Sequence, residues 1–302
     1  MLKREIELPP EHLFPPDEWR IVETRWTPRY SERAETVFAL ANGYVGIRGT
    51  FDEGRPSLQP GTFISGLHET WPIVHAEEAY GLAQVGQSIV TAPDATVLEL
   101  FVDDEPLFLP TARLRHYRRN LDMRTGVLQR ELQWSTPAGK HVTVSSSRIV
   151  SLEHRHIAAI SFEVTVDRPA PIAIVSRVIN RANGAVDSAA GADGEPNDPR
   201  LGRQLNHRVL QPRLATDGDG RLVLGYEVTN SGMTLALGVH HSIESTAPYQ
   251  LATSANGDLA EMVLSAQARP GEPIRIVKYV TYQTSRSVSP DDLAARCQRT
   301  LD

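Results

Sequence analysis

Carboxylates, imidazoles and an indole gather in one short stretch of the chain, and these side chains can bind or protonate sugars. His68 and Glu69 are adjacent, Trp71 follows, and Glu77 and Glu78 come a few residues later. Two carboxyl groups roughly 5 to 10 Å apart across a cleft can act as general acid and base on a glycosidic bond. An indole offers an apolar face with a polar N–H. The sequence does not place these groups across a cleft, and an exposed loop is the simpler interpretation of Glu77 and Glu78.

Other polar groupings indicate structure rather than chemistry. Asp103-Asp104-Glu105-Pro106 follows an apolar run and predicts a hairpin turn. The three glycines of Asn42–Gly49 match neither the dinucleotide fingerprint nor a P-loop, so we expect a turn and close backbone approach there. His154 and His156 are two residues apart, which on a strand would put both imidazoles on one face, but no third ligand is near, so we expect no metal site.

Charge and cysteine usage narrow the class of protein. The 302 residues carry a formal net charge of −6 and a single cysteine, Cys297. A chain with this charge has no global positive field to attract nucleic acid, and one cysteine forms neither an internal disulfide nor a thiolate zinc site. No run approaches the about 20 apolar residues of a membrane span, and Met1 is not followed by a signal-peptide core. We therefore predict a cytoplasmic protein with no nucleic-acid or membrane partner.

The elements that must position these residues are mostly strands. From about Val127 onward, apolar and polar residues alternate in short runs, which is typical of antiparallel strands with one buried face. Gly, Pro, Asn and Asp separate the runs and favour chain reversal. The predicted strands are 127–134, 140–150, 158–166, 172–180, 221–229, 233–241, 259–266 and 273–282. Without long helical patterns between them, these strands predict an all-β fold, a large antiparallel β-sandwich.

Two segments depart from the strand pattern. Residues 181–204 are rich in small and polar residues and predict a long loop. At the end of the chain, Ser289 can cap a short helix, and Leu293, Cys297 and Leu301 fall on one of its faces. This apolar stripe must pack against something. The helix is either a terminal helix lying on the sandwich or the start of a further part of a longer protein.

Several motifs in the first half of the chain occur in a specific order. They lie in Phe38–Gly49, Gly61–Gly66, Val102–Pro106 and Leu121–Gly126. Together they resemble the N-terminal domain of glycoside hydrolase family 65, which includes maltose, trehalose, kojibiose and nigerose phosphorylases and some α-glucosidases. The resemblance runs from about Trp19 to Tyr282.

The resemblance implies a super-β-sandwich of the galactose-mutarotase kind in residues 1–285 and the start of a helical linker in residues 286–302. In the family, an (α/α)6 barrel follows and carries the general-acid glutamate and the phosphate-binding residues. We therefore expect no catalytic residue here and predict that this chain alone is inactive. No cofactor is expected, although inorganic phosphate could serve the full-length enzyme as co-substrate. The expected partners are the barrel of the same parent chain and an α-glucosyl disaccharide, with a homodimer left open.

A role at the barrel is the leading hypothesis for the candidate residues. We expect the loops Asn42–Gly49 and Phe63–Glu78 to face the barrel, with Trp71 or His68 nearest the substrate. The barrel-facing or substrate-proximal residues are then Asn42, Arg48, His68, Glu69, Trp71, Glu77 and Glu78.

Two other functions stay open. One is a freestanding carbohydrate-binding module whose aromatic side chains stack on sugars. The other is a mutarotase-like epimerase that uses His154, His156 and Glu163, which is disfavoured because His156 and Glu163 fall on opposite faces of the predicted strand.

Overall fold

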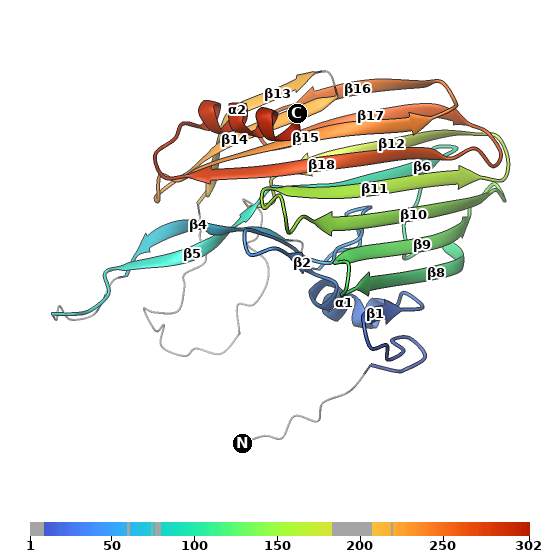
Figure 1. Ribbon diagram of the computed structural model, residues 1–302, viewed down its shortest axis with the longest axis horizontal. Helices are drawn as coiled ribbons and strands as arrows, with labels where there is room; N and C mark the ends of the chain where they lie inside the picture. Colours follow the sequence, from blue (N-terminus) through green and yellow to red (C-terminus); the bar gives the residue numbers. More distant parts are fainter. Residues whose placement is uncertain (1–8, 59–60, 74, 76–79, 183–206, 219) are drawn as a thin grey trace.

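Antiparallel sheets make up most of the protein, which the computed structural model describes over residues 9–58, 61–73, 75, 80–182, 207–218 and 220–302 (Figure 1). Over these residues the largest sheet has nine strands, in the order β1 (Arg20–Glu23), β8 (Arg113–Asp122), β9 (Val127–Ser135), β10 (His141–Val150), β11 (Ile157–Val166), β18 (Ile274–Ser285), β15 (Thr234–Ser245), β14 (Arg221–Val228) and β13 (Leu210–Gly218).

Two smaller sheets complete the described strands. One has the order β16 (Tyr249–Ala255), β17 (Leu259–Ala268), β12 (Ala170–Ile179), β6 (Asp94–Val102) and β7 (Glu105–Pro106). The other has the order β2 (Leu40–Ala41), β3 (Val45–Ile47), β4 (Thr62–Pro72) and β5 (Val85–Ala92). The described helices are η1 (Pro28–Tyr30), α1 (Ser31–Val37) and α2 (Pro290–Leu301). None of them has the length and apolar content that crossing a membrane requires.

The sheet that contains β12 and β6 packs against one half of the largest sheet. Polar contacts cross the layers there: Ser176 Oγ on β12 lies 2.8 Å from His241 Nε2 on β15. The hydroxyl of Tyr282 on β18 donates to the carbonyl of Pro93 at 2.9 Å. Between these contacts, the inward side chains of both sheets belong to one continuous hydrophobic core. The predicted antiparallel β-sandwich is thus confirmed.

The alternation of apolar and polar residues predicted strands correctly where one face of the strand is buried. Every strand range predicted from it is confirmed to within a few residues. The hairpin turn at Asp103–Pro106 is also confirmed, since Asp103 and Asp104 adopt φ angles of 52° and 64° between β6 and β7. Among the strands after Val127, β13 and β16 were not predicted, because neither has a regularly alternating buried face. The loop expected at Phe63–Glu78 is partly wrong, because its first part belongs to β4.

The predicted C-terminal helix lies on the outer face of the largest sheet. Ser289 Oγ accepts a hydrogen bond from the amide of Asp292 at 3.2 Å, as expected of a cap. Leu293, Ala294 and Cys297 are buried against β14 and β15. Gly238 on β15 allows this close approach, since a Cβ atom there would lie 3.0 Å from the Cβ of Cys297. Most of the predicted loop 181–204 lies outside the described residues.

Candidate functional site

The most prominent feature near the predicted site residues is the hairpin formed by β4 and β5. The pairing register shifts between Phe63 and His68, and Gly66 within this bulge has a φ of +82°. A bulge bends a strand and changes the direction of the residues after it. Beyond it the two strands pair again, His68 with Ile89 and onward, and the hairpin projects away from the sandwich (Figure 1).

The hairpin has two different faces. Because successive side chains of a strand point to opposite sides, Glu69 and Trp71 share one face with Ser88, their cross-strand neighbour. We call this the anchored face. His68 and Ile89 lie on the opposite face, which we call the open face. Two of the predicted site residues are therefore separated from the third by the hairpin itself.

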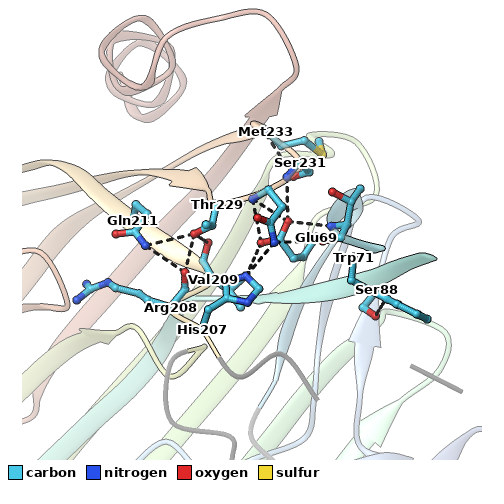
Figure 2. A network of polar contacts seen from close by, with 12 residues as sticks. Glu69, Trp71, Ser88, His207, Arg208, Val209, Gln211, Thr229, Ser231 and Met233 are labelled. Carbon is cyan, nitrogen blue, oxygen red and sulfur yellow. Dashed lines mark hydrogen bonds and ion pairs between the residues drawn. The ribbon is translucent and has the colours of Figure 1, made fainter. Parts of the chain in front are cut away.

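Glu69 ties the hairpin to the sandwich (Figure 2). Its side chain is fully buried and accepts hydrogen bonds from the amides of Asn230 at 3.1 Å and Ser231 at 2.9 Å, in the turn between β14 and β15. Glu69 Oε2 also lies 3.0 Å from His207 Nε2. Burial favours a higher pKa for Glu69, but the hydrogen bonds from His207 and from the amides of Thr70, Asn230 and Ser231 outweigh it and lower the pKa. Glu69 is thus a satisfied anion with a structural role.

Trp71 braces the same face. Its Nε1 donates to Ser88 Oγ at 3.0 Å, and the side chain is only 9% exposed. The indole lies across Gly86 on β5, where an added Cβ atom would come within 2.3 Å of the ring. Cross-strand packing of an aromatic ring over a glycine stabilises a strand pair. Little of the ring is left to stack on a sugar.

The other predicted residues also make structural contacts. Asn42 Oδ1 accepts the amide hydrogens of Tyr44 and Val45, and its Nδ2 donates to the carbonyls of Ser151 and Arg155. Asn42 therefore shapes the β2–β3 turn and fixes it to the β10–β11 turn.

Arg48, directly after β3, contacts the helix α1. Its Nη2 donates to Thr36 Oγ1 at 3.1 Å and lies 3.9 Å from Glu35 Oε2. His68 is half-buried, with Nδ1 2.8 Å from the carbonyl of Gly66. Glu77 and Glu78 lie outside the described residues. The described candidates converge on no common cleft, and their orientation toward a barrel stays a prediction.

A buried charged cluster was missed by the sequence reasoning. Arg130 donates two hydrogen bonds to Glu53, at 2.6 and 2.7 Å, and lies 3.2 Å from Asp52. Asp52 also accepts from Arg148 at 2.8 Å and Ser146 at 2.6 Å. Burial alone would raise the pKa of Asp52, but Arg130 and Arg148 outweigh it and hold that pKa at about 2. The sequence did contain a signal for this cluster. Arg130 and Arg148 stand at positions where the alternation of β9 and β10 calls for a buried apolar residue.

The buried charged cluster extends to β8 of the largest sheet. Arg119 Nη2 donates to the carbonyl of Gly49 at 2.6 Å, and its guanidinium lies 4.4 Å from the ring centre of Phe38. Asp52 and Glu53 hold the segment that follows β3 on β9 and β10, and the Gly49 carbonyl holds it on β8. The space left among these side chains is about 10 Å³, room for a single water. The cluster is a structural brace and not a sugar site.

Two further groups of residues bear on the alternative functions. A pocket of about 530 Å³ lies beside β7 and the start of β8, and its lining includes Arg55, Glu105, Phe108, Arg113 and Trp134.

His156 precedes β11, whereas Glu163 lies near its far end, so at about 3.3 Å per residue the two are roughly 20 Å apart. That separation argues against their acting as an acid and base pair on one sugar. Among the described residues, no group of three or more His, Cys, Asp or Glu side chains is arranged to hold a metal ion.

Comparison with known families identifies this fold. The family described as "Glycosyl hydrolase family 65, N-terminal domain" matches residues 21–302. The chain belongs to this family. The resemblance noted from its motifs is confirmed, and the sandwich described above is the family 65 N-terminal domain.

Relatives of this family 65 domain include longer proteins. It is 34% identical to an uncharacterized glycosyl hydrolase of Mycobacterium tuberculosis, over 90% of this chain and 34% of that protein. It is 30% identical to the alpha,alpha-trehalose phosphorylase of Thermoanaerobacter brockii, over 94% of this chain and 36% of that enzyme. The chain thus spans about a third of the length of these relatives.

A solved structure shows the same fold. The domain superposes on the structure described as "Putative kojibiose phosphorylase from human microbiome" with a TM-score of 0.76, covering 95% of this chain and 36% of that one. At 18% identity, this similarity establishes the fold and not the substrate.

Proposed function

We propose that this chain is the non-catalytic N-terminal domain of a family 65 phosphorylase or hydrolase that acts on α-linked glucosyl disaccharides. In this proposal the sandwich packs on the catalytic barrel of the same polypeptide and helps to shape its substrate site. Residues 286–302, which include α2, begin the linker to that barrel. The predicted cytoplasmic location belongs to the same proposal.

The observation that carries the proposal is the extent of the family match. Residues 21–302 match the N-terminal domain of the family, and the aligned region makes up 36% of the related trehalose phosphorylase. The described ionisable clusters are consistent with a domain that does no chemistry itself. Asp52, Glu53 and Glu69 are buried with their hydrogen-bonding partners rather than directed into an open cleft.

A supporting domain has a clear physical use in such an enzyme. In an inverting phosphorolysis, an acid protonates the glycosidic oxygen while phosphate attacks from the opposite face of the sugar. Water competes with phosphate for that position, so an enclosed site favours phosphorolysis. A rigid sandwich beside the barrel mouth would supply part of the enclosure.

An activity assay with two proteins tests the proposal. The 302-residue chain and the complete protein are each incubated with maltose, trehalose or kojibiose, with and without inorganic phosphate. We expect glucose 1-phosphate or glucose from the complete protein only. Release by the purified 302-residue chain above the background of the same preparation inactivated by heat would overturn the non-catalytic role.

The pocket beside β7 favours a second candidate, a carbohydrate-binding module. Its aromatic residues Phe108 and Trp134 and its charged residues Arg55 and Glu105 combine an apolar lining with hydrogen-bonding groups. Titration of the 302-residue chain with maltose or trehalose, followed by tryptophan emission, tests this function. Saturable binding that Arg55→Ala weakens would support this function. An equally weak, non-saturable change of emission in the wild-type chain and in the Arg55→Ala variant would exclude it.

A further inference from the structure

The open face of the β4–β5 hairpin is unlike an ordinary solvated surface. Its described residues beyond the bulge include no Asp, Glu, Lys or Arg; they are His68, Thr70, Pro72, Val85, Gln87 and Ile89. Val85 and Ile89 are 61% and 62% exposed, and Pro72 is exposed as well. Depletion of charge with retained apolar side chains is typical of the centre of a protein interface.

The outer edge of the hairpin also lacks the residues that usually prevent pairing with another chain. β5 is the outermost strand of its sheet, and its sequence Val85–Ala92 has neither a charged residue nor a proline. Soluble proteins usually protect an exposed edge strand with such residues, because a bare edge pairs with other chains. A two-stranded hairpin is also only marginally stable in water by itself. A projecting ribbon of this kind requires both an anchor and a cover.

Glu69 supplies the anchor. The hydrogen bonds from Asn230 and Ser231 to its carboxylate hold the anchored face on the β14–β15 turn. Trp71 stiffens the ribbon across Gly86. A surface already held in one conformation loses less entropy when it docks. The hairpin is therefore ordered from one face and available from the other.

We propose that the open face of the β4–β5 hairpin is the surface on which this domain docks the catalytic domain of its own polypeptide. This inference rests on the proposed function. The occupant follows from the length of the trehalose phosphorylase relative, about two thirds of which lies outside the region that this chain matches. The position of the hairpin agrees with this occupant. The helix α2, which begins the proposed linker, packs on β14 and β15, and Glu69 fixes the hairpin to the turn between the same two strands.

Hydrogen exchange compares the hairpin in two proteins. The amides of Val85–Val90 are measured in the 302-residue chain and in the complete protein. We expect exchange in the complete protein to be about tenfold slower or more, since docking removes local opening. Equal exchange in the two proteins would overturn the proposal.

Variants of the complete protein separate docking from folding. The double variant Val85→Asp, Ile89→Asp places two charges on the open face, while Leu152→Asp adds one charge to the 81% exposed Leu152 in the β10–β11 turn. We expect the double variant to lose the added protection of Val85–Val90 and to be cut faster between the domains by protease. Leu152→Asp is expected to change neither quantity. Unaltered circular dichroism of the same variants in the 302-residue chain shows that the sandwich still folds.

The remaining outcomes are also decisive. If the double variant keeps its interdomain protection, the open face is not the docking surface. If protection depends on protein concentration and the double variant converts a dimer to a monomer, the occupant is a second copy and the proposal is wrong. Phosphorolysis by the wild-type complete protein is measured in parallel. An active protein with an unprotected hairpin overturns the docking surface alone, whereas inactivity on every disaccharide questions the proposed function.

Discussion

Arg119 on β8 lies directly opposite Arg130 on β9, and both side chains are buried. Like charges in register across two strands destabilise a sheet unless other groups compensate. Here Glu53 and Asp52 compensate for Arg130, and the carbonyl of Gly49 and the Phe38 ring contact Arg119. The segment that follows β3 is therefore held on the sheet by charge as well as by apolar packing.

Removal of Arg130 tests this brace. Arg130→Ala leaves Asp52 and Glu53 buried without their shared cation, so we expect the free energy of unfolding to fall by about 3–5 kcal/mol. Urea denaturation measures the change. Arg213→Ala is the matched control, because Arg213 pairs with Glu227 on the surface and should cost less than about 1 kcal/mol. Equal losses in the two variants would show that the buried cluster contributes nothing special.

Acid should weaken the same cluster. The pKa of Asp52 is lowered to about 2 in the folded protein from an ordinary value of 3.8. Because the folded state binds this proton less readily than the unfolded state, the stabilisation is fully present above about pH 4 and is lost as the pH falls toward 2. Denaturation across that range measures the slope. Asp52→Asn should have a shallower slope, and identical slopes would contradict the assignment.

Lys278 should also make the protein more stable as the pH rises, but in the alkaline range. It is fully buried, its Nζ donates to the carbonyls of Arg177 and Val97, and burial lowers its pKa to about 7 from an ordinary 10.5. Between these values the unfolded state binds the proton and the folded state does not, so stability should rise as the pH increases from 7 to 10.5.

Replacement of this lysine provides the measurement. Lys278→Met removes the buried ionisable group, and we expect it to raise the free energy of unfolding at pH 6 by on the order of 1–4 kcal/mol and to flatten the rise at alkaline pH. Arg275→Met, on the same strand but partly exposed, serves as the control. A Lys278→Met protein that is less stable at pH 6 would show that the contacts of the lysine outweigh its desolvation.

The Glu69 anchor should control the order of the hairpin. Glu69→Gln removes the anion that accepts from Asn230 and Ser231, and we expect a loss of about 1–3 kcal/mol in local stability. Hydrogen exchange of residues 85–90 in the 302-residue chain measures this loss. Wild-type protein should show a similar loosening when the pH falls below the lowered pKa of Glu69. His68→Gln, on the open face, should leave exchange unchanged.

Close packing of α2 depends on Gly238. Gly238→Val places side-chain atoms where Cys297 and Leu301 already lie, so we expect α2 to detach and the thiol of Cys297 to become accessible. In the wild type, Cys297 is buried and its pKa is raised to about 12, which makes it inert. A thiol reagent measures the labelling rate. Gly46→Ala, which meets only ordinary contacts, should label as slowly as the wild type.

The sequence by itself determined the strands with one buried face after Val127, the Ser289 helix cap, the Asp103–Asp104 turn and the family. These features depend on side-chain periodicity, capping and φ preferences, which are local properties of a few consecutive residues. Order along the chain was enough to recognise the family motifs, because they are collinear. The strands β13 and β16 were missed for the same reason, since neither carries a regular apolar pattern.

Only the tertiary structure decided what the charged candidates do. Glu69 is an anchor because residues 161 and 162 positions further along the chain bring their amides to it. Arg130 is a brace because Glu53 lies 77 positions away in sequence but within hydrogen-bonding distance in space. Whether a buried carboxylate is a structural ion or a reactive group depends on the donors around it, and distant segments supply those donors only after the sheets have packed.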